Sequence, residues 1–228
     1  MKVGIITYNI SHAKTQELVH GLLKKNYEIS LILINFKEYK KRIPLYDHRP
    51  TQFTGPTPEQ LAKNFNLNFY SINQINNIKD INFFLIGGGG LIGKNQIIKD
   101  KIINCHPGLI PLSRGLDSLK WTIYNAYPLG NTLHYIDENI DSGKIISHKI
   151  TPIFESDCFN DIAKRHYDSE INMLINFENY LAKPLIYSLK HGSPTKRMST
   201  VNEGDMMKNL EIFKKINIEK KFNNYLIK

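Results

Sequence analysis

Residues 2–34 read KVGIITYNISHAKTQELVHGLLKKNYEISLILI, and this stretch decides the fold. The apolar run over residues 2–7 predicts a buried strand, and apolar residues at helical spacing predict a helix over residues 13–25. A second apolar run at residues 29–34 predicts another strand. A strand, a helix and a strand in this order form a βαβ unit, which implies that the two strands run parallel in one sheet.

The following segments continue this alternation. Further strands are predicted at residues 69–72, 81–87, 101–106, 132–136 and 144–150, and helices over residues 116–127 and 158–181. Residues 37–58 form a long loop, and Thr57-Pro58-Glu59-Gln60 at its end has the composition of a helix start. The pattern therefore predicts an α/β domain with a parallel sheet over residues 1–190.

The composition changes near residue 193. Beyond Ser193-Pro194 the chain becomes polar and rich in lysine. We expect residues 191–228 to form a C-terminal appendage that is partly helical, with one short helix near residues 205–216.

Charge, cysteine content and apolar runs indicate which ligands and which cellular compartment to expect. Lys and Arg number 30 and Asp and Glu 21, so the net charge is +9, which favours anionic ligands, including nucleotides and RNA. No basic run is long enough to form a nucleic-acid arm, and Cys105 and Cys158 have neither a disulfide framework nor metal-binding spacing. The first apolar run is too short for a signal peptide, and none approaches the roughly 20 residues of a membrane helix. We expect a cytoplasmic protein with no metal and no nucleic-acid or membrane partner.

Polar residues follow the predicted strand that ends at residue 106. Residues 104–111 read Asn-Cys-His-Pro-Gly-Leu-Ile-Pro, then come Arg114-Gly115 and, further on, Ile140-Asp141-Ser142-Gly143. An amide, an imidazole and a carboxylate, each beside a turn-forming residue, indicate one polar site at the end of the sheet.

This ordered set resembles the folate-dependent formyltransferase family, whose pattern is Asn-x-His, then Leu-Pro-x-x-Arg-Gly, then Asp-x-Gly. The likeness covers residues 80–150 closely and the first 80 loosely, and Pro107-Gly108 stands where relatives often have Pro-Ser. It implies a Rossmann-like open sheet, mostly parallel, with helices on both faces and the site at the carboxyl ends of the strands. It also implies that N10-formyltetrahydrofolate, as co-substrate, gives its formyl group to an amine.

The resemblance implies three catalytic residues. Asn104 would donate its amide to the oxyanion of the tetrahedral intermediate. His106 would either take the amine proton or donate to the oxyanion, and Asp141 would favour the charged imidazole and order a water. Each of these residues could instead serve an ordinary turn. Cys105 and His134 are expected to pack, because alternation along a strand points Cys105 away from the catalytic pair.

Residues 87–90 are four consecutive glycines whose spacing fits neither a dinucleotide fingerprint nor a Walker loop. Glycines let a flat ring approach the backbone closely. The resemblance implies folate contacts at Ile86, Gly87, Gly88, Gly89, Leu91, Asp137 and Ile140. A phosphate-cradling loop and a plain strand-to-helix turn are the alternatives.

The acceptor is expected to be a nucleotide-linked amino sugar. Residues 8–13 read YNISHA where relatives that formylate glycinamide ribonucleotide have a glycine-rich phosphate loop, and residues after Ser193 are too few for the second domain of the tRNA-directed relatives. The stretches 114–121 and 46–50 look like those of amino-sugar formyltransferases. We therefore expect dTDP-4-amino-4,6-dideoxyglucose, or a 3-amino isomer, in O-antigen or surface-glycan biosynthesis by a homodimer.

Substrate-binding candidates follow from that acceptor. Its diphosphate would meet Arg49, Lys94 and Arg114, with Gly115 beside them, and its base would stack on Tyr46, Phe53 or Trp121. A solvated surface charge or a core aromatic is the alternative for each side chain. Other functions stay open: a phosphoribosylglycinamide or other amine formyltransferase, a formyltetrahydrofolate hydrolase, a non-catalytic binding protein, or an RNA-binding module, although no RNP-like stretch is present.

Overall fold

The computed structural model describes residues 1–38, 43–90, 92–222 and 224–226, and the chain divides into two compact units. Unit 1 comprises Met1–Lys40, Thr51–Asn104 and Tyr135–Glu138. Unit 2 comprises Lys41–Pro50, Cys105–His134 and Asn139–Lys228. Each unit has a hydrophobic cluster of its own.

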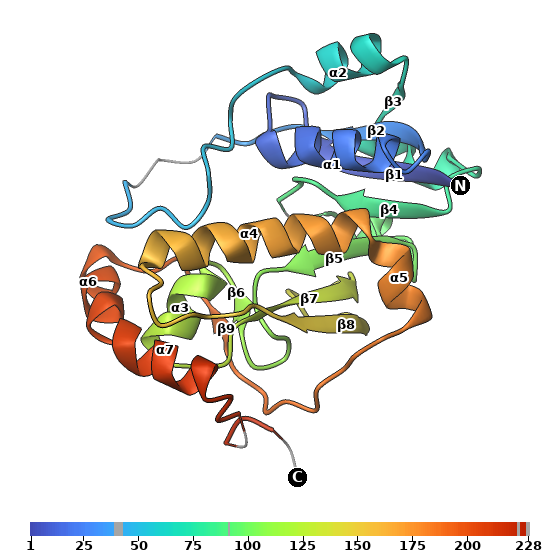
Figure 1. The fold of residues 1–228 in the computed structure, drawn as a ribbon. Coiled ribbons are helices and arrows are strands. Elements are labelled where there is room, and N and C mark those ends of the chain that lie inside the picture. The colour runs from blue at the N-terminus through green and yellow to red at the C-terminus, as the bar shows by residue number, and fades with distance from the viewer. Residues whose placement is uncertain (39–42, 91, 223, 227–228) are drawn as a thin grey trace. The chain divides into compact units, whose positions relative to one another are not determined.

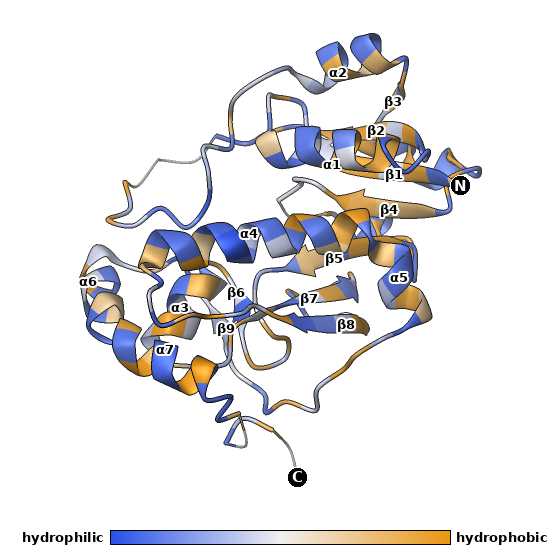
Figure 2. Cartoon of the chain, viewed as in Figure 1, coloured by the Kyte–Doolittle hydropathy of each residue, from blue (hydrophilic) through white to orange (hydrophobic). Residues whose placement is uncertain are grey.

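Unit 1 is built on the predicted βαβ element, formed by β1 (Lys2–Tyr8), α1 (Ala13–Leu23) and β2 (Glu28–Ile34). Strand β1 pairs in parallel with β2 and β4 (Phe83–Ile86), β2 with β3 (Asn68–Ser71), and β4 with the start of β5 (Ile102–His106). The strand order is therefore β3-β2-β1-β4-β5. Strands β1, β2 and β4 are mostly apolar and buried, as Figure 2 shows for β1 and β4, because central parallel strands are covered on both faces. The edge strand β3 is largely exposed.

Helix α2 (Pro58–Phe65) begins as the sequence predicts. The side chain of Thr57 accepts a hydrogen bond from the Gln60 amide (3.3 Å), and the Gln60 side chain accepts one from the Thr57 amide (2.8 Å). This capping box satisfies amides that lack partners in the first helical turn. Two short 3₁₀ turns, η1 (Ile72–Asn77) and η2 (Lys94–Gln96), complete unit 1.

Unit 2 contains the end of β5, then β7 (Gly130–Tyr135) next in the strand order, and β8 (Ile145–Ile150), which pairs antiparallel with β7. A second, small sheet joins β6 (Arg114–Gly115) to β9 (Pro194–Thr195). The helices of unit 2 are α3 (Ser118–Tyr124), α4 (Phe159–Ile175), α5 (Phe177–Ala182), α6 (Thr200–Lys208) and α7 (Leu210–Ile218). Figure 1 shows α3, α6 and α7 grouped together. The open, mostly parallel α/β arrangement that we predicted is confirmed.

Two predicted helices are wrong in extent. The single helix expected over residues 158–181 is divided at Asn176, whose side chain donates to the Asn172 carbonyl. The one short helix expected at residues 205–216 is instead the pair α6 and α7, divided at Asn209, whose side chain donates to the Tyr124 carbonyl. Asparagine competes for backbone hydrogen bonds in this way, and apolar periodicity does not reveal it.

The C-terminal segment shares the core of unit 2. Met206 and Phe213 are fully buried in one cluster with Leu119 and Ile123 of α3. The division into a domain over residues 1–190 and an appendage over 191–228 stays a prediction. None of the helices in the described part of the chain has the length and hydropathy that a membrane span requires.

We predict that Thr57→Ala lowers the free energy of unfolding by about 1 kcal/mol, because the α2 cap is lost. Urea denaturation measures the change. Thr57→Ser is the matched control, because serine keeps the capping oxygen, and it should unfold close to wild type. Equal losses in the two variants would contradict the capping role.

Candidate active site

His106 is the last residue of β5 and is 3% exposed. Its Nε2 lies 2.9 Å from Ser118 Oγ and 3.1 Å from the Ser113 carbonyl oxygen. The Ser118 hydroxyl donates to the Gly115 carbonyl (2.9 Å), so its oxygen is left to accept. A nitrogen that faces two acceptors carries a proton; the hydrogen bonds therefore assign the neutral tautomer with hydrogen on Nε2.

Asp141 faces the other imidazole nitrogen. Its Oδ2 lies 3.4 Å from His106 Nδ1 and accepts the Gly115 amide at 2.8 Å. Asp141 has a φ of 47°, in the left-handed region that aspartate tolerates better than most residues. A proton taken up by His106 would thus enter on Nδ1, next to a carboxylate held in place by a backbone amide.

Burial lowers the pKa of His106 below 6.5, and the charges of Asp141 and Glu170 oppose this shift. The imidazole is therefore neutral near pH 7 and can accept a proton. The carboxylate of Asp141 would stabilise the resulting cation, which is the arrangement a general base requires.

Gly108 borders the imidazole closely. A Cβ atom at this position would lie 2.9 Å from both His106 Nε2 and the Ser113 carbonyl oxygen. The departure from the Pro-Ser of relatives at residues 107–108 thus has a local reason, because a serine side chain would not fit this arrangement.

Arg114 and Gly115 form β6 at the edge of this site. Arg114 Nη2 donates to the Ile140 carbonyl (2.8 Å), and its Nε is buried with no hydrogen-bond partner in the described chain. Gly115 has a φ of +91°, and a side chain there would overlap the backbone of Thr195. The structure thus brings together the predicted residues His106, Arg114, Gly115, Ile140 and Asp141.

Arg49 and Tyr46 also belong to unit 2, and the charge of Arg49 contributes to lowering the pKa of His106. Arg49 Nη2 is 2.8 Å from Glu170 Oε2, and its guanidinium lies 5.6 Å from the centroid of the Tyr167 ring. Tyr46 packs on Phe159, with 5.6 Å between ring centroids, at the edge of the unit 2 core. The charge of Arg49 is thus compensated by a buried carboxylate. A small pocket beside this pair is lined by His48, Arg49, Pro107, His166, Tyr167 and Glu170.

Two imidazoles in this pocket are held neutral. Burial lowers the pKa of His48 to about 3 and that of His166 to about 4. His166 Nδ1 lies 2.8 Å from Thr151 Oγ1, whereas its Nε2 is buried without a hydrogen-bond partner among the described residues. Two neutral imidazoles, those of His48 and His166, therefore line the pocket together with Pro107, the residue that follows His106.

The glycine loop belongs to unit 1. The amides of Gly87 and Gly88 donate to the Ile6 carbonyl (2.9 and 3.1 Å), and that of Gly90 donates to the Tyr8 hydroxyl (3.1 Å). A Cβ atom on Gly88 would lie 2.7 Å from the His12 ring. These glycines are thus needed for packing within unit 1, and a ligand that used these three amides would replace existing bonds.

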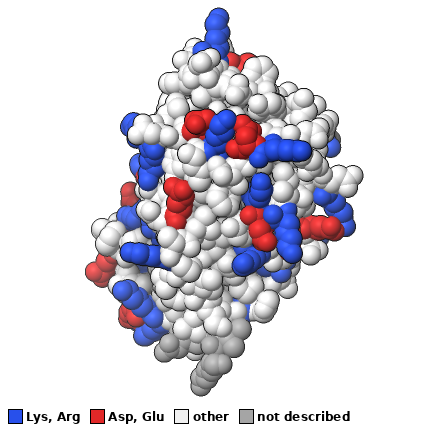
Figure 3. Space-filling model, turned by 90° about the vertical axis from the view of Figure 1, so that its right-hand side faces the viewer, with Lys and Arg blue, Asp and Glu red and all other residues white. Residues whose placement is uncertain are grey.

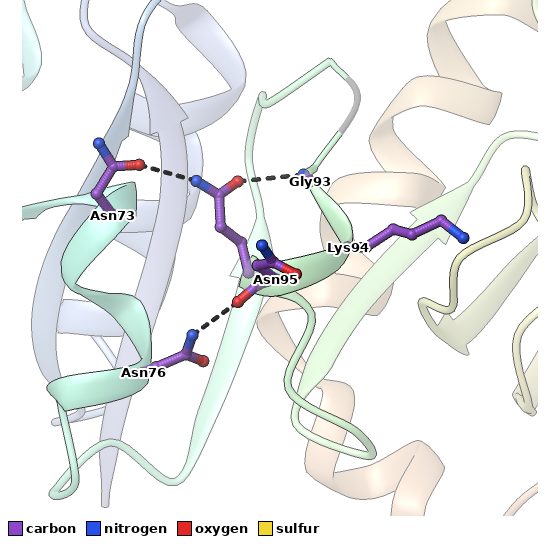
Figure 4. Close-up of a pocket in the computed structure, with 6 residues that line it drawn as sticks. Asn73, Asn76, Gly93, Lys94 and Asn95 are labelled. Carbon is purple, nitrogen blue, oxygen red and sulfur yellow. Dashed lines mark hydrogen bonds between the residues drawn. The ribbon is translucent and has the colours of Figure 1, made fainter.

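The other predicted residues belong to unit 1, whereas His106 and its partners belong to unit 2. Ile86 ends β4, and Asn104 and Asp137 also belong to unit 1; Leu91 lies outside the described residues. Lys94 is 73% exposed and pairs with Glu138 at 2.6 Å. Figure 4 shows it pointing away from an amide-lined pocket in which Gln96 bonds to Asn73 and Gly93.

Sequence reasoning missed four polar residues of this region: Ser113 and Ser118, which hold His106 Nε2, and His166 and Glu170, which line the pocket. His166 and Glu170 are four residues apart on α4 and are both nearly fully buried. Polar residues at helical spacing on the buried face of α4 were the available signal. The two serines carried none, because serine is common in turns.

Comparison with known proteins bears on residues 85–177, which match the model of the formyl transferase family. The phosphoribosylglycinamide formyltransferase of Bacillus subtilis (strain 168) is 35% identical over 105 residues, covering 42% of this chain and 54% of that protein. The trifunctional purine biosynthetic protein adenosine-3 of Chironomus tentans is 37% identical over 73 residues, which are 32% of this chain and 5% of that protein. The chain thus spans about half the length of the first relative and a small part of the second.

Solved structures share the fold at lower identity. An N-formyltransferase from Helicobacter canadensis, in complex with folinic acid and dTDP-3-aminofucose, has a TM-score of 0.64 at 18% identity, covering 92% of this chain and 80% of that one. The phosphoribosylglycinamide formyltransferase of Campylobacter jejuni has a TM-score of 0.60 at 20% identity, covering 80% and 98%. The two structures therefore resemble this fold to a similar degree.

We predict that Asp141→Asn lowers the pKa of His106 further, because the negative charge that opposes the effect of burial is removed. The asparagine oxygen can still accept the Gly115 amide, so folding should persist. NMR titration of the His106 ring measures the shift. His148, whose lowered pKa comes from burial, is the internal control. A His106 pKa that stays the same or rises would contradict the assignment.

We also predict that the protein loses stability as the pH falls from about 6.5 to 5. The folded pKa values of His48 and His166 lie below the unfolded value, so the unfolded chain binds more protons in this range and is favoured. His166 alone should contribute on the order of 1–2 kcal/mol. Urea unfolding at a series of pH values tests this, and His166→Gln should flatten the dependence. A wild-type curve without slope would contradict it.

Proposed function

We propose, from the match of residues 85–177 to the formyl transferase family model, that the chain moves a formyl group from N10-formyltetrahydrofolate to the amine of a nucleotide-linked amino sugar. The observation that carries the reaction type is the buried imidazole of His106, whose Nε2 is fixed by Ser113 and Ser118 and whose Nδ1 faces Asp141.

The neutral amine of the acceptor attacks the formyl carbon, and a C–N bond forms. The carbonyl oxygen becomes an oxyanion, toward which Asn104 would donate its side-chain amide. His106 takes the proton that the amine loses, on Nδ1, and Asp141 stabilises the cation. The bond from the formyl carbon to folate N10 then breaks, the carbonyl reforms, and N10 receives a proton, which leaves tetrahydrofolate and a formamide.

Folate is proposed to contact Ile86, Gly87, Gly88, Gly89, Leu91, Asp137 and Ile140. The glycines present no side chain, which favours the close approach of a flat ring. Since the amides of Gly87 and Gly88 are already bonded to Ile6, contacts by these two residues would use their carbonyl groups.

An amino sugar linked to a nucleotide, for which dTDP-4-amino-4,6-dideoxyglucose is our first candidate, is supported by two observations. Residues 8–13 lack a glycine-rich phosphate loop, and the Helicobacter canadensis structure that shares the fold holds dTDP-3-aminofucose. Arg114, Gly115, Tyr46 and Arg49 would bind this acceptor, with Lys94 as a more exposed candidate. The product would enter O-antigen or other surface-glycan synthesis, made by a cytoplasmic homodimer.

Glycinamide ribonucleotide is the second candidate acceptor. It is favoured by the 35% identity with the phosphoribosylglycinamide formyltransferase of Bacillus subtilis. RNA is less favoured, because basic and acidic side chains are interspersed on the face shown in Figure 3.

The experiment that decides between these acceptors is mass spectrometry of the products. The purified protein is supplied with 10-formyltetrahydrofolate and, in turn, with dTDP-4-amino and dTDP-3-amino dideoxyhexoses, UDP-4-amino-arabinose and glycinamide ribonucleotide. We expect one formyl mass to be added to a dTDP-linked sugar. Transfer to glycinamide ribonucleotide alone would overturn the acceptor, and no transfer at all would overturn the reaction.

We predict that His106→Ala reduces turnover by about 100-fold or more, the usual scale for a removed acid or base. Steady-state assays of formyl transfer measure it, and circular dichroism checks the fold. His191→Ala, which replaces an exposed histidine of the same unit, is the matched control and should behave as wild type. Near-normal turnover in His106→Ala would remove this residue from the mechanism.

A further inference from the structure

Glu203 is a buried carboxylate on α6 that receives bonds from two other segments of unit 2. It is 1% exposed. Its Oε1 lies 2.8 Å from Lys120 Nζ on α3, and its Oε2 accepts the backbone amide of Leu45 at 2.6 Å. One side chain thus joins the C-terminal part of the chain to α3 and to the segment 43–50.

Helix α3 begins with Ser118, which contacts the imidazole of His106. Lys120 is two residues beyond Ser118, whose Oγ lies 2.9 Å from His106 Nε2. Asp117, just before this helix, accepts the Met198 amide (2.9 Å). The start of α3, and with it the serine that orients the imidazole, is therefore held by the segment that leads into α6.

The segment 43–50 carries acceptor-binding candidates, including Tyr46 and Arg49. The side chain of Leu45 is exposed, at 59%, so Leu45 is not held by burial of its own, whereas the neighbouring Tyr46 packs on Phe159. Its amide is held by the Glu203 carboxylate, and four residues later Arg49 is held by Glu170 (2.8 Å). Two buried carboxylates therefore fix the segment at two points.

The Lys120–Glu203 ion pair is an energetically unfavourable way to stabilise the core alone. The two side chains are 2% and 1% exposed, so both charges are desolvated. Replacing such a pair by apolar residues of similar volume is often neutral or stabilising, whereas removing one partner is strongly destabilising. An apolar pair would, however, leave the Leu45 amide without its acceptor.

We propose that Glu203 is a positioning residue: it sets the segment 43–50 and helix α3 in the arrangement that admits the acceptor next to His106. This inference rests on the proposed function for its kinetic consequence, although the placement of the segment can be measured without any reaction. The effect of Glu203 on the site would pass through Lys120 and the Leu45 amide, which it binds.

The decisive variant is the double substitution Lys120→Met/Glu203→Leu, which removes both charges and keeps the core apolar. We expect thermal stability near that of wild type, faster hydrogen exchange of amides in the segment 43–50, and a KM for the acceptor raised about tenfold. A tenfold change corresponds to about 1.4 kcal/mol, which is near the value of a hydrogen bond to a charged group. The KM for 10-formyltetrahydrofolate should not change, because the bonds from Glu203 to Lys120 and to the Leu45 amide lead to α3 and to the segment of the acceptor candidates.

Asp205→Asn is the matched control. Asp205 lies on the same helix, is 43% exposed and pairs with Lys208, so its loss removes the same charge from a surface site. It should leave both hydrogen exchange and the two KM values as in wild type. If the double variant does not fold, Lys120→Leu/Glu203→Met takes its place, because it also removes both charges and exchanges the two apolar side chains between the positions.

Unchanged exchange in the segment 43–50 and an unchanged acceptor KM would overturn the proposal and make the pair a structural support only. Equal rises in both KM values would overturn it as well, because the effect would not be specific to the acceptor. If the wild-type protein transfers no formyl group, the proposed function fails, whereas the hydrogen-exchange result still tests the positioning role.

Discussion

The rest of the site depends on the burial of His106. Its imidazole lies between the Ser113 carbonyl group and the Ser118 hydroxyl group on one side and the Asp141 carboxylate on the other. Ser113 and Ser118 occupy Nε2, so only Nδ1 can exchange a proton, and Asp141 faces that atom. Burial lowers the pKa of the ring and so keeps it in the neutral form that can accept a proton near pH 7, while the Asp141 carboxylate limits how far this pKa falls. A more exposed imidazole would be partly protonated and less defined in orientation.

This arrangement needs residues that are distant in the sequence. Gly115 binds Asp141 through its amide, and its positive φ lets Thr195 approach, so β6 and β9 pair directly at the edge of the site. The side chain of Thr195 donates to the Arg114 carbonyl (2.8 Å). The C-terminal part of the chain is therefore a support of the candidate active site, in addition to burying Met206 and Phe213 in the core of unit 2.

The sequence predicted what depends on local patterns. Apolar runs marked β1, β2 and β5, the Thr57 cap marked the start of α2, and the motif residues His106, Arg114 and Asp141 proved to be neighbours in unit 2. What it did not predict depends on long-range partners. The helix breaks at Asn176 and Asn209, the pairing of β6 with β9, and the ion pairs of Arg49 with Glu170 and Lys120 with Glu203 arise only when segments far apart in the chain meet. Periodicity does not encode such contacts.

The most direct test of formyl transfer follows the carbon itself. The protein is mixed with 10-formyltetrahydrofolate labelled with ¹³C in the formyl group and with a dTDP-linked 4-amino-4,6-dideoxyhexose, and the label is followed by ¹³C NMR. The mechanism predicts that the folate signal is replaced by a formamide carbon bonded to the sugar nitrogen. Label that appears only as free formate would show hydrolysis, and label that stays on folate would show no reaction; either result would contradict transfer to a nucleotide-linked amino sugar.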